Sequence, residues 1–365
     1  MPPAAPRPAR RVTKRLPGCR RSPAAALLTA ALLMACGDDG GGPAPPDGPT
    51  ELTGEKFSVT WGPVLVQPGV ENTQCAVLEL GNDAPLKIHR MRNLLGNASH
   101  HLIVYRDDDA APQPTPVDCS PFAGTLTATS ATSPIMITQR HDETLTLPDQ
   151  VAYTFQPRQR LRLELHYLNA TDRPQMVTAS AEFYPAVPEQ IEHEADFLFI
   201  GTPDITLPPN SSTTVNSYFT PPFSVSFEGA RFFAITGHTH QYGTGVEVAV
   251  APGRGLPGTS VYAPRTFVWS EPETVMQDPP FELPTGSGFS FRCTYRNTST
   301  RTVRFGESTG NEMCFFWAYY YPARGAHLCA HSDQAGGANG LDVCCPAADT
   351  DLTSKFVCNL IAQQL

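Results

Sequence analysis

The feature that most constrains the fold is a series of short runs in which apolar and polar residues alternate. Examples are Phe57 to Trp61, Leu161 to His166 and Ser212 to Phe219. Alternation with a period of two is typical of strands with one buried face, because successive side chains point to opposite faces. Turn residues separate the runs at intervals of roughly ten residues, which is typical of antiparallel β-sandwiches. We therefore predict an all-β protein.

The segment from Tyr184 to Gln190 divides the strand pattern into two halves, and we place a domain boundary near Pro188. The prediction is two antiparallel, jelly-roll-like β-sandwich domains in tandem, followed by a disulfide-rich tail. Within the tail, Thr353 to Gln364 is expected to form a short helix. The predicted boundaries are 1–35 for a signal peptide, 36–55 for a flexible tether, 56–188 and 189–330 for the two sandwiches, and 331–365 for the tail.

The N-terminus has the pattern of a bacterial lipoprotein signal peptide. Residues 1–35 contain seven Lys or Arg and no acidic residue, and an apolar run extends from Ala24 to Met34. This run is too short to span a bilayer as a stable helix. It is followed by Ala35 and Cys36. We expect Cys36 to become the lipidated first residue, which would anchor the protein in a bacterial cell envelope, facing the periplasm or the cell exterior.

The chain without its leader is predicted to be strongly acidic. Removing seven of the 26 basic residues leaves 19 against 35 acidic residues, a net charge of −16. No basic patch with interleaved aromatic residues remains, so nucleic acid is not an expected partner. We expect a monomer whose partners are the membrane and a small-molecule substrate.

The first candidate for a metal site is the pair His100 and His101, which precedes an apolar strand. Adjacent residues of a regular strand point to opposite faces. Both can bind one ion only where the backbone is distorted, or where the chain is just entering the strand, and Gly96 to Ser99 allows the second option. His166 is a candidate third ligand, because the leucines before it share the other face. We expect its side chain to point outward, into a cleft or solvent.

The second candidate is formed by His238 and His240, which follow a predicted buried strand from Ala230 to Ile235. Positions i and i+2 of a strand point to the same side, so both imidazoles can bind one ion. Met313 is a candidate third ligand, because thioether sulfur is soft and neutral and favours Cu(I) over zinc or calcium. Taken singly, these residues could equally be packed histidines and a packed methionine. Their conjunction with the first group predicts copper.

The order of these motifs resembles that of the copper type II, ascorbate-dependent monooxygenases. The resemblance covers roughly residues 70 to 330 and is most specific in Leu161 to Tyr167 and in Cys293 to Pro322. It implies two copper ions per chain, one on each sandwich, facing a solvent-filled cleft. The second copper would be the place where O2 binds and the substrate is attacked. The implied ligands are His100, His101 and His166 for the first copper, and the catalytic His238, His240 and Met313 for the second.

Eight of the ten cysteines lie outside the leader and the lipidation site, and an even number in an exported protein indicates disulfides. The resemblance implies the pairs Cys75–Cys119 and Cys293–Cys314, of which the second would pin Met313 beside its neighbouring strand. A bond between adjacent cysteines is the least expected of the three pairings left for the tail. The four cysteines concerned are Cys329, Cys344, Cys345 and Cys358.

The surroundings of the second site depart from the peptide-hydroxylating relatives. Those enzymes hold a peptide carboxylate with an arginine, an asparagine and a tyrosine, and the matching positions here are Thr236, Phe315 and Trp317. The implied pocket is aromatic and uncharged. We therefore expect hydroxylation of a C–H bond in a small apolar or aromatic substrate, with O2 and with ascorbate or another one-electron reductant. The alternatives are an envelope lipoprotein that binds or buffers copper without turnover, and a structural or adhesive one. Five other histidines are interpreted as surface or structural residues: His89, His141, His193, His327 and His331.

Overall fold

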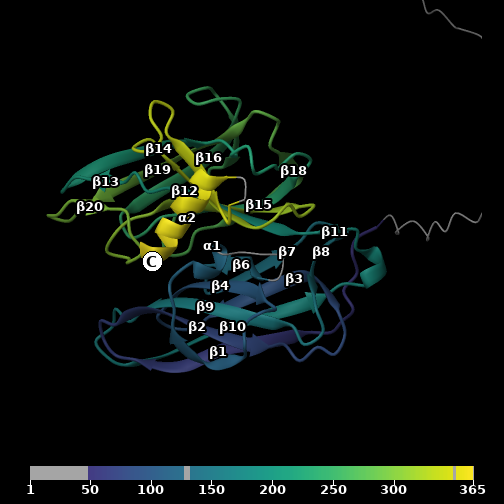
Figure 1. The fold of residues 1–365 in the computed structure, drawn as a ribbon. Coiled ribbons are helices and arrows are strands. Elements are labelled where there is room, and N and C mark those ends of the chain that lie inside the picture. Colours follow the sequence, from purple (N-terminus) through teal and green to yellow (C-terminus); the bar gives the residue numbers. More distant parts are fainter. Residues whose placement is uncertain (1–47, 127–131, 348–350, 365) are drawn as a thin grey trace, which may run out of the picture. The chain divides into compact units, whose positions relative to one another are not determined.

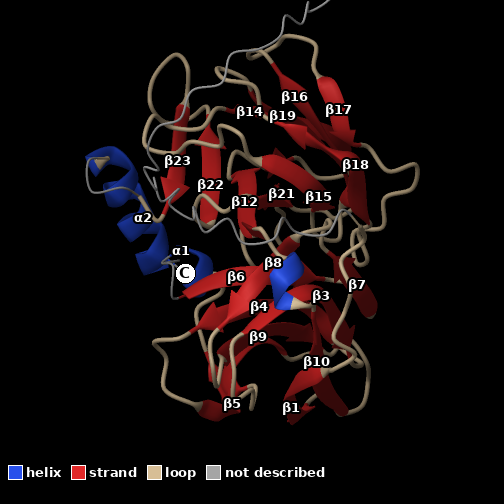
Figure 2. Ribbon diagram, turned by 90° about the vertical axis from the view of Figure 1, so that its right-hand side faces the viewer, coloured by secondary structure: helices blue, strands red, loops and turns tan. Residues whose placement is uncertain are grey.

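The computed structural model describes residues 48–126, 132–347 and 351–364, which all fall in one compact unit, Pro45–Leu365. Nearly all of their regular structure is strand, so the predicted all-β class is confirmed (Figures 1 and 2). The predicted signal peptide, Cys36 and most of the tether lie outside the described residues. Within the described ranges, no helix is both long and apolar enough to cross a membrane.

The first half of the chain forms two facing sets of strands. One sheet has the order β1-β10-β3-β8-β11, with β7 beside β3, and the other has the order β5-β2-β9-β4-β6. The strands are β1 (Phe57–Val66), β2 (Glu71–Glu79), β3 (Leu86–Leu95), β4 (Ser99–Asp107), β5 (Gln113–Asp118), β6 (Thr132–Thr138), β7 (Asp142–Thr146), β8 (Val151–Phe155), β9 (Arg160–Leu168), β10 (Gln175–Pro185) and β11 (His193–Glu194). A short helix α1 (Ala123–Leu126) lies between β5 and β6.

The second half contributes the remaining strands. Its largest sheet has the order β18-β15-β21-β12-β22-β23, and a second sheet has the order β14-β19-β16-β17. The strands are β12 (Asp196–Thr202), β13 (Thr206–Leu207), β14 (Ser211–Phe219), β15 (Arg231–His238), β16 (Gly243–Ala251), β17 (Thr259–Tyr262), β18 (Thr274–Glu282), β19 (Gly288–Asn297), β20 (Val303–Arg304), β21 (Cys314–Tyr321), β22 (His327–Ser332) and β23 (Leu341–Cys345). The predicted boundary at residue 188 falls in a 3-10 helix, η1 (Pro188–Gln190). Because β11 still pairs with β8, the chain changes from one set of sheets to the other between Glu194 and Asp196.

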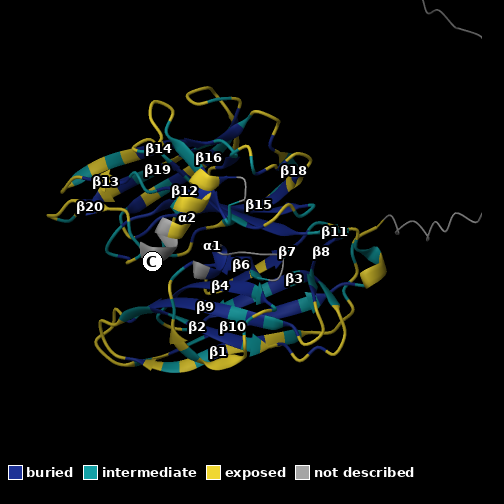
Figure 3. Ribbon diagram, viewed as in Figure 1, coloured by how far each residue is buried: buried dark blue, intermediate teal, exposed yellow. Residues whose placement is uncertain are grey.

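The central sheet of the second half is buried on both faces, which explains why β12, β15 and β21 are almost continuously apolar instead of alternating (Figure 3). One face, with Ile200 and Phe316, packs into the core of the second half. The opposite face, with Phe199 and Trp317, belongs to the same hydrophobic cluster as Leu163 of the first half. The two halves therefore share a continuous core.

The tail is held by two disulfides that decide between the pairings left open by the sequence. Cys329 bonds to Cys344, which joins β22 to β23, and Cys345 bonds to Cys358 of the terminal helix α2 (Leu352–Gln364). The helix begins one residue before its predicted start. The two bonds fix the β22–β23 hairpin and α2 against the edge of the central sheet.

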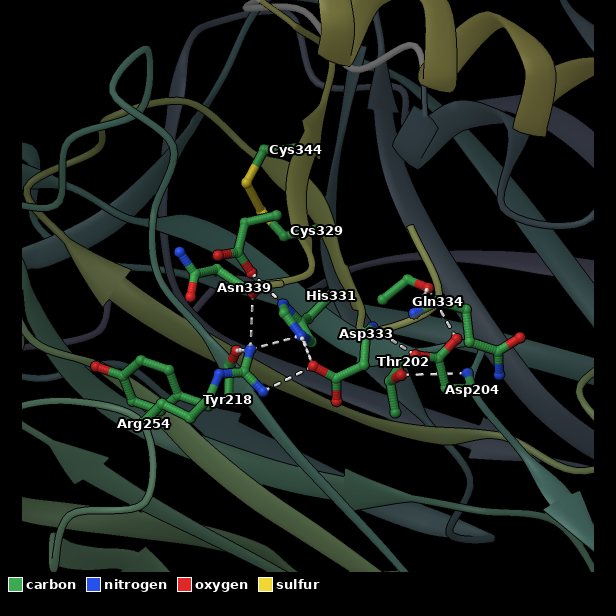
Figure 4. A network of polar contacts seen from close by, with 12 residues as sticks. Thr202, Asp204, Tyr218, Arg254, Cys329, His331, Asp333, Gln334, Asn339 and Cys344 are labelled. Atoms are coloured by element: carbon green, nitrogen blue, oxygen red, sulfur yellow. Dashed lines mark hydrogen bonds and ion pairs between the residues drawn. A yellow bond between two sulfur atoms is a disulfide. The ribbon is translucent and has the colours of Figure 1, made fainter. Parts of the chain in front are cut away.

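A polar network reinforces the same hairpin (Figure 4). His331 of β22 is fully buried, and its Nδ1 lies 2.8 Å from Asp342 Oδ1 of β23. Its Nε2 lies 3.1 Å from Asp333 Oδ1 and 2.6 Å from Arg254 Nη2. Arg254 follows β16, so the network connects the hairpin to the other sheet of the second half. His331 is thus a structural histidine.

The stability of the protein is expected to fall when His331 loses its proton. Burial lowers the pKa of His331, but Asp342 and Asp333 together raise it above its ordinary value of about 6.5, against the opposing charge of Arg254. A raised folded-state pKa adds stability that is complete below the unfolded pKa and is lost as the pH rises through the folded pKa. We expect the stability difference between wild type and His331→Gln to be larger at pH 5.5 than at pH 8.5, as measured by urea unfolding. An equal difference at both pH values would contradict this.

Candidate metal centre

The first histidine group is formed by two neighbouring strands. His100 and His101 lie on β4, His166 lies on β9, and His101 and His166 are register partners. One ring nitrogen from each of the three side chains lies within 4.8 Å of the others, and all three side chains are buried. The ring centroids of His101 and His166 are 5.0 Å apart. The three residues that the resemblance implied as ligands of the first copper are therefore brought together.

The two adjacent histidines can face one site because β4 is irregular at this point. The register with β9 shifts between Ser99 and His101, so the extra residue, His100, lies in a bulge. The backbone is therefore distorted within the strand, which was the first of the two options considered. The chain also enters the strand here, because β4 begins at Ser99, one residue before His100.

Glu71 on β2 orients His166. The His166 Nε2–H donates to Glu71 Oε1 over 3.1 Å, and this hydrogen bond is the main reason that the pKa of Glu71 is lowered to about 2. An ionised carboxylate can only accept, so the proton lies on Nε2 and the Nδ1 lone pair remains for a metal. Glu71 also accepts from the Thr309 amide at 2.9 Å and from the Ser308 hydroxyl at 3.1 Å. It therefore links His166 to a loop of the second half.

The second histidine group lies at the end of β15. His238 is the last residue of the strand, and His240 follows in the turn before β16, with the two ring centroids 5.1 Å apart. Glu312 shapes this turn, because its buried carboxylate accepts the amides of His240 and Tyr242 at 2.9 and 2.7 Å. Gly243 completes the turn, because a Cβ there would lie 1.8 Å from the Thr239 hydroxyl. The expectation that His240 lies on the strand is wrong, and the turn brings it to the site instead.

Hydrogen bonds fix the tautomers of both imidazoles. The His238 Nδ1–H donates to Gln139 Oε1 over 2.8 Å, and the Gln139 amide nitrogen lies 3.4 Å from the Trp269 carbonyl. The His240 Nδ1–H donates to the Asn311 carbonyl over 3.2 Å. In His238 the Nε2 lone pair is left for a metal, as is usual for metal-binding histidines held by an outer hydrogen bond. His240 is also hydrogen-bonded to the backbone of Ser308.

Met313 lies on the same face of the central sheet as His238. β15 and β21 are antiparallel with His238 opposite Phe315, and directly opposed residues point to the same side. Met313 is 2% exposed, and its carbonyl accepts the Tyr295 hydroxyl at 2.6 Å. The register therefore places Phe315, two residues after Met313, on the side of His238, and the turn after β15 brings His240 beside His238.

The two histidine groups lie beside each other, which corrects the expected solvent-filled cleft. The ring centroids of His100 and His240 are 6.2 Å apart. Gln139, from the end of β6, reaches across to His238. The cavities that border these histidines are about 250 and 10 Å³. The outward side of β9 is likewise buried, since His166 is only 5% exposed. The apolar faces of the two halves pack together, and the space beside the first histidine group is the cavity of about 250 Å³ lined by Glu71, His101 and His166.

Burial keeps the imidazoles neutral, which is the form that binds a metal. It lowers the pKa of His100 to about 3 and that of His240 to about 4, and it lowers the pKa values of His101 and His238 well below the ordinary value. Across the described ranges, His100 Nε2, both nitrogens of His101 and His238 Nε2 are buried without a hydrogen-bond partner. Such nitrogens are costly unless something binds them. Neutral imidazoles with a buried thioether fit copper.

A family comparison supports this donor set. Residues 193–337 match the family model described as "Copper type II ascorbate-dependent monooxygenase, C-terminal domain". The resemblance is confirmed for this segment. The matched monooxygenase domain contains His238, His240 and Met313, whereas the first histidine group lies outside it.

Solved structures add nothing to this conclusion. The major capsid protein P2 of bacteriophage PM2 aligns with 73% of this chain and 97% of its own at 9% identity and a TM-score of 0.32. The Sulfolobus turreted icosahedral virus structure aligns with 75% of this chain and 91% of its own at 7% identity and a TM-score of 0.26. Scores this low carry no argument about function.

The disulfides that the resemblance implied are present, with Cα–Cα distances of 5.8 Å for both Cys75–Cys119 and Cys293–Cys314. The second bond ties β21, beside Met313, to β19 of the facing sheet. Of the three predicted pocket residues, Phe315 lines a large cavity next to Met313, and Trp317 lines a small one next to His238. The Thr236 hydroxyl instead pairs with that of Thr274 at 2.7 Å.

The sequence analysis did not predict the residues that hold the candidate histidine ligands in place. Glu312 directly precedes Met313 in the sequence, and an acidic residue next to a candidate ligand at the start of an apolar strand could have predicted it. Glu71 and Gln139 carried no local signal, because they lie 95 and 99 residues from the histidines that they contact. Phe122 stacks on His101 with a centroid distance of 5.8 Å and is held by the Glu164 carboxylate, which accepts its amide at 2.8 Å.

A Glu71→Gln variant is expected to bind the first copper about 10-fold more weakly, because outer-shell partners of metal ligands typically contribute 10- to 100-fold. The amide can still accept from His166, but it lacks the charge that orients the ring and raises its basicity. Affinity would be measured by competition with a Cu(I) chelator. Glu79→Gln, at an acid of the same strand that pairs with Arg158 on the surface, is the matched control. Equal affinities in the two variants would rule out this role.

Proposed function

We propose that the protein is a copper-dependent monooxygenase that hydroxylates a C–H bond of a small apolar or aromatic molecule. It would use O2 and take electrons from ascorbate or another one-electron reductant. The monooxygenase domain match supports the kind of reaction. Thr236, Phe315 and Trp317 stand where the peptide-hydroxylating relatives hold the carboxylate with an arginine, an asparagine and a tyrosine, and the loss of that arginine supports an uncharged substrate.

The observation that carries this proposal is the convergence of five buried imidazoles from both halves of the chain. Each group has lone pairs without partners, and the two groups are separated by ring-centroid distances of about the same size as those within each group. A single histidine cluster could be a packed polar patch. Two adjoining clusters, in which hydrogen bonds fix the tautomers of His166, His238 and His240, are arranged to hold redox-active metal.

The overall reaction is RH + O2 + 2e⁻ + 2H⁺ → ROH + H2O, and the reductant supplies both electrons. Copper held by these residues would supply one-electron redox chemistry at each site. His100, His101 and His166 would hold one ion, and His238, His240 and Met313 the other. The protein's contribution is to keep four of the imidazoles neutral by burial and to fix the tautomers of the other ring and of two of these four. Glu71 does so for His166, Gln139 for His238 and the Asn311 carbonyl for His240.

The test is copper analysis combined with O2 consumption. We expect two copper ions per chain and O2 uptake with ascorbate that exceeds that of the same amount of free copper. A His100→Ala/His101→Ala variant should bind one ion and lose the uptake. Two ions without uptake would favour copper binding or buffering, and zero or one ion in the wild type would defeat the two-copper proposal.

We also propose that a lipid on Cys36 anchors a monomeric protein in the bacterial envelope, facing the periplasm or the exterior. The leader pattern in the sequence supports this. Cells fed an alkyne-tagged fatty acid should label the wild type but not Cys36→Ala. Labelling of both proteins would refute the anchor, and light scattering of the Cys36→Ala protein would report its oligomeric state.

A further inference from the structure

A cavity with a volume of about 740 Å³ lies beside Met313. This is within the range of about 300–1,000 Å³ that is typical of small-molecule sites. Its inner wall is formed by aromatic and apolar side chains of the central sheet and of the first half, including Phe199, Phe315 and Phe122. These rings stack on one another, with 4.9 Å between the centroids of Phe199 and Phe315. Gly201 makes room for Phe315, because a Cβ there would lie 2.0 Å from its ring.

The outer wall comes from the disulfide-held tail, which lies mostly beyond the matched monooxygenase domain. Ala330 and Ser332 of β22, Leu341 and Val343 of β23, and Val357 of α2 all line the cavity. The two tail disulfides and the His331 network hold this wall in place. The tail therefore forms one wall of the cavity next to the second candidate copper site.

Polar groups in the cavity are few. Glu307 carries the one ionisable side chain among the lining residues, and no lining residue is a lysine or an arginine. Glu307 also lines the smaller cavity that contains His101 and His166, so it stands between the large cavity and the first histidine group. Burial, together with the Glu164 carboxyl group, raises the pKa of Glu307 to about 8. A lining of this kind cannot pair with an anion, and its hydrogen-bonding side chains are Glu307 and Ser332, whose hydroxyl already donates to Asp204.

We propose that this cavity is the substrate site and that it binds a neutral, predominantly apolar molecule whose single hydrogen-bond donor is accepted by the Glu307 carboxyl group. This inference rests on the proposed function in one respect, which is that the bound molecule reacts at the end of the cavity next to Met313. Anionic molecules, including peptides with a free carboxylate, are excluded because no cationic side chain lines the cavity to pair with them. The tail sets the far limit of the site.

The test compares two fluorescent probes with the same aromatic skeleton. N-phenyl-1-naphthylamine is neutral and has one N–H donor, whereas 8-anilino-1-naphthalenesulfonate adds a negative charge. The full chain, copper-free and copper-loaded, is expected to bind the neutral probe at least 10-fold more tightly than the sulfonate. Ala330→Trp, which fills the cavity from the outer wall, should weaken binding of the neutral probe at least 10-fold. Leu341→Trp gives a second obstruction if the first variant fails to fold.

A charge substitution makes the test specific to Glu307. Glu307→Lys should reverse the preference, strengthening the sulfonate at least 10-fold, because the cavity would then contain a cation. Glu189→Lys, the same change at an exposed position of η1, should leave both affinities unchanged. Neutral-probe binding that both tryptophan variants leave unchanged, or a preference that Glu307→Lys leaves unchanged, would overturn the proposal.

The outcomes separate this inference from the proposed function. Probe binding with the expected variant effects, but without bound copper, would support the cavity and refute the monooxygenase. Two bound copper ions, with probe binding that the cavity variants leave unchanged, would support the two-copper proposal and refute the cavity as the substrate site. Binding by Cys36→Ala but not by the lipidated wild type would show that the protein's own acyl chain occupies the cavity, and would overturn the proposal of a substrate site.

Discussion

A Met313→Ile variant is expected to keep one copper ion and to lose at least about 100-fold of its O2-dependent turnover. Loss of an outer-shell partner already costs about 10- to 100-fold, and removing a ligand should reach the upper end of that range. Isoleucine has a similar volume and suits an extended segment, so the fold should be preserved at a cost below about 1.5 kcal/mol. The measurements are copper per chain and O2 uptake with ascorbate.

The matched control is Met91→Ile. Met91 is fully buried and lies on β3, a strand that carries none of the candidate ligands. The substitution therefore makes the same change of side-chain shape in the core without removing a candidate ligand. This variant should keep two copper ions and wild-type uptake. If Met313→Ile also kept both, the thioether would be a packing residue, and the second site would be formed by His238 and His240 with some other donor.

Removing the disulfide beside Met313, in Cys293→Ala/Cys314→Ala, is expected to lower the free energy of unfolding by about 3 kcal/mol. The bond spans 21 residues of sequence, and closing a loop of this size restricts the unfolded chain by roughly that amount. The variant should also bind the second copper more weakly, because Cys314 fixes the start of β21 directly after Met313. Urea unfolding of the copper-free protein and chelator competition measure the two effects.

Cys345→Ala/Cys358→Ala provides the comparison. This bond spans 13 residues and connects β23 to α2. Its loss should loosen the outer wall of the large cavity and weaken binding of the neutral probe, while affinity for the second copper stays unchanged. A fall in copper affinity of equal size in both variants would mean that the effect is general destabilisation instead of local positioning of Met313.

Local patterns in the sequence were enough to predict the strands and most of the candidate ligands. Alternation identified β9, because it depends on the direction of neighbouring side chains along one strand. The His-x-His spacing identified the second group, although its second histidine lies in the turn after β15. Details of the backbone were harder. The bulge at His100 and the turn that carries His240 depend on a register shift and on Glu312, and neither changes the apolar pattern that was used to predict the strands.

The sequence by itself determined that the chain is all β, that it carries two histidine groups and a methionine suited to copper, and that the tail would be joined by disulfides. Only the tertiary structure decided that the two groups adjoin, that Glu71 and Gln139 hold their tautomers, and that the tail encloses a cavity beside Met313. The physical reason is that one strand's periodicity specifies which side chains share a face. Which segment packs against that face depends on contacts between residues about a hundred or more positions apart in the sequence, and a local pattern carries no information about such contacts.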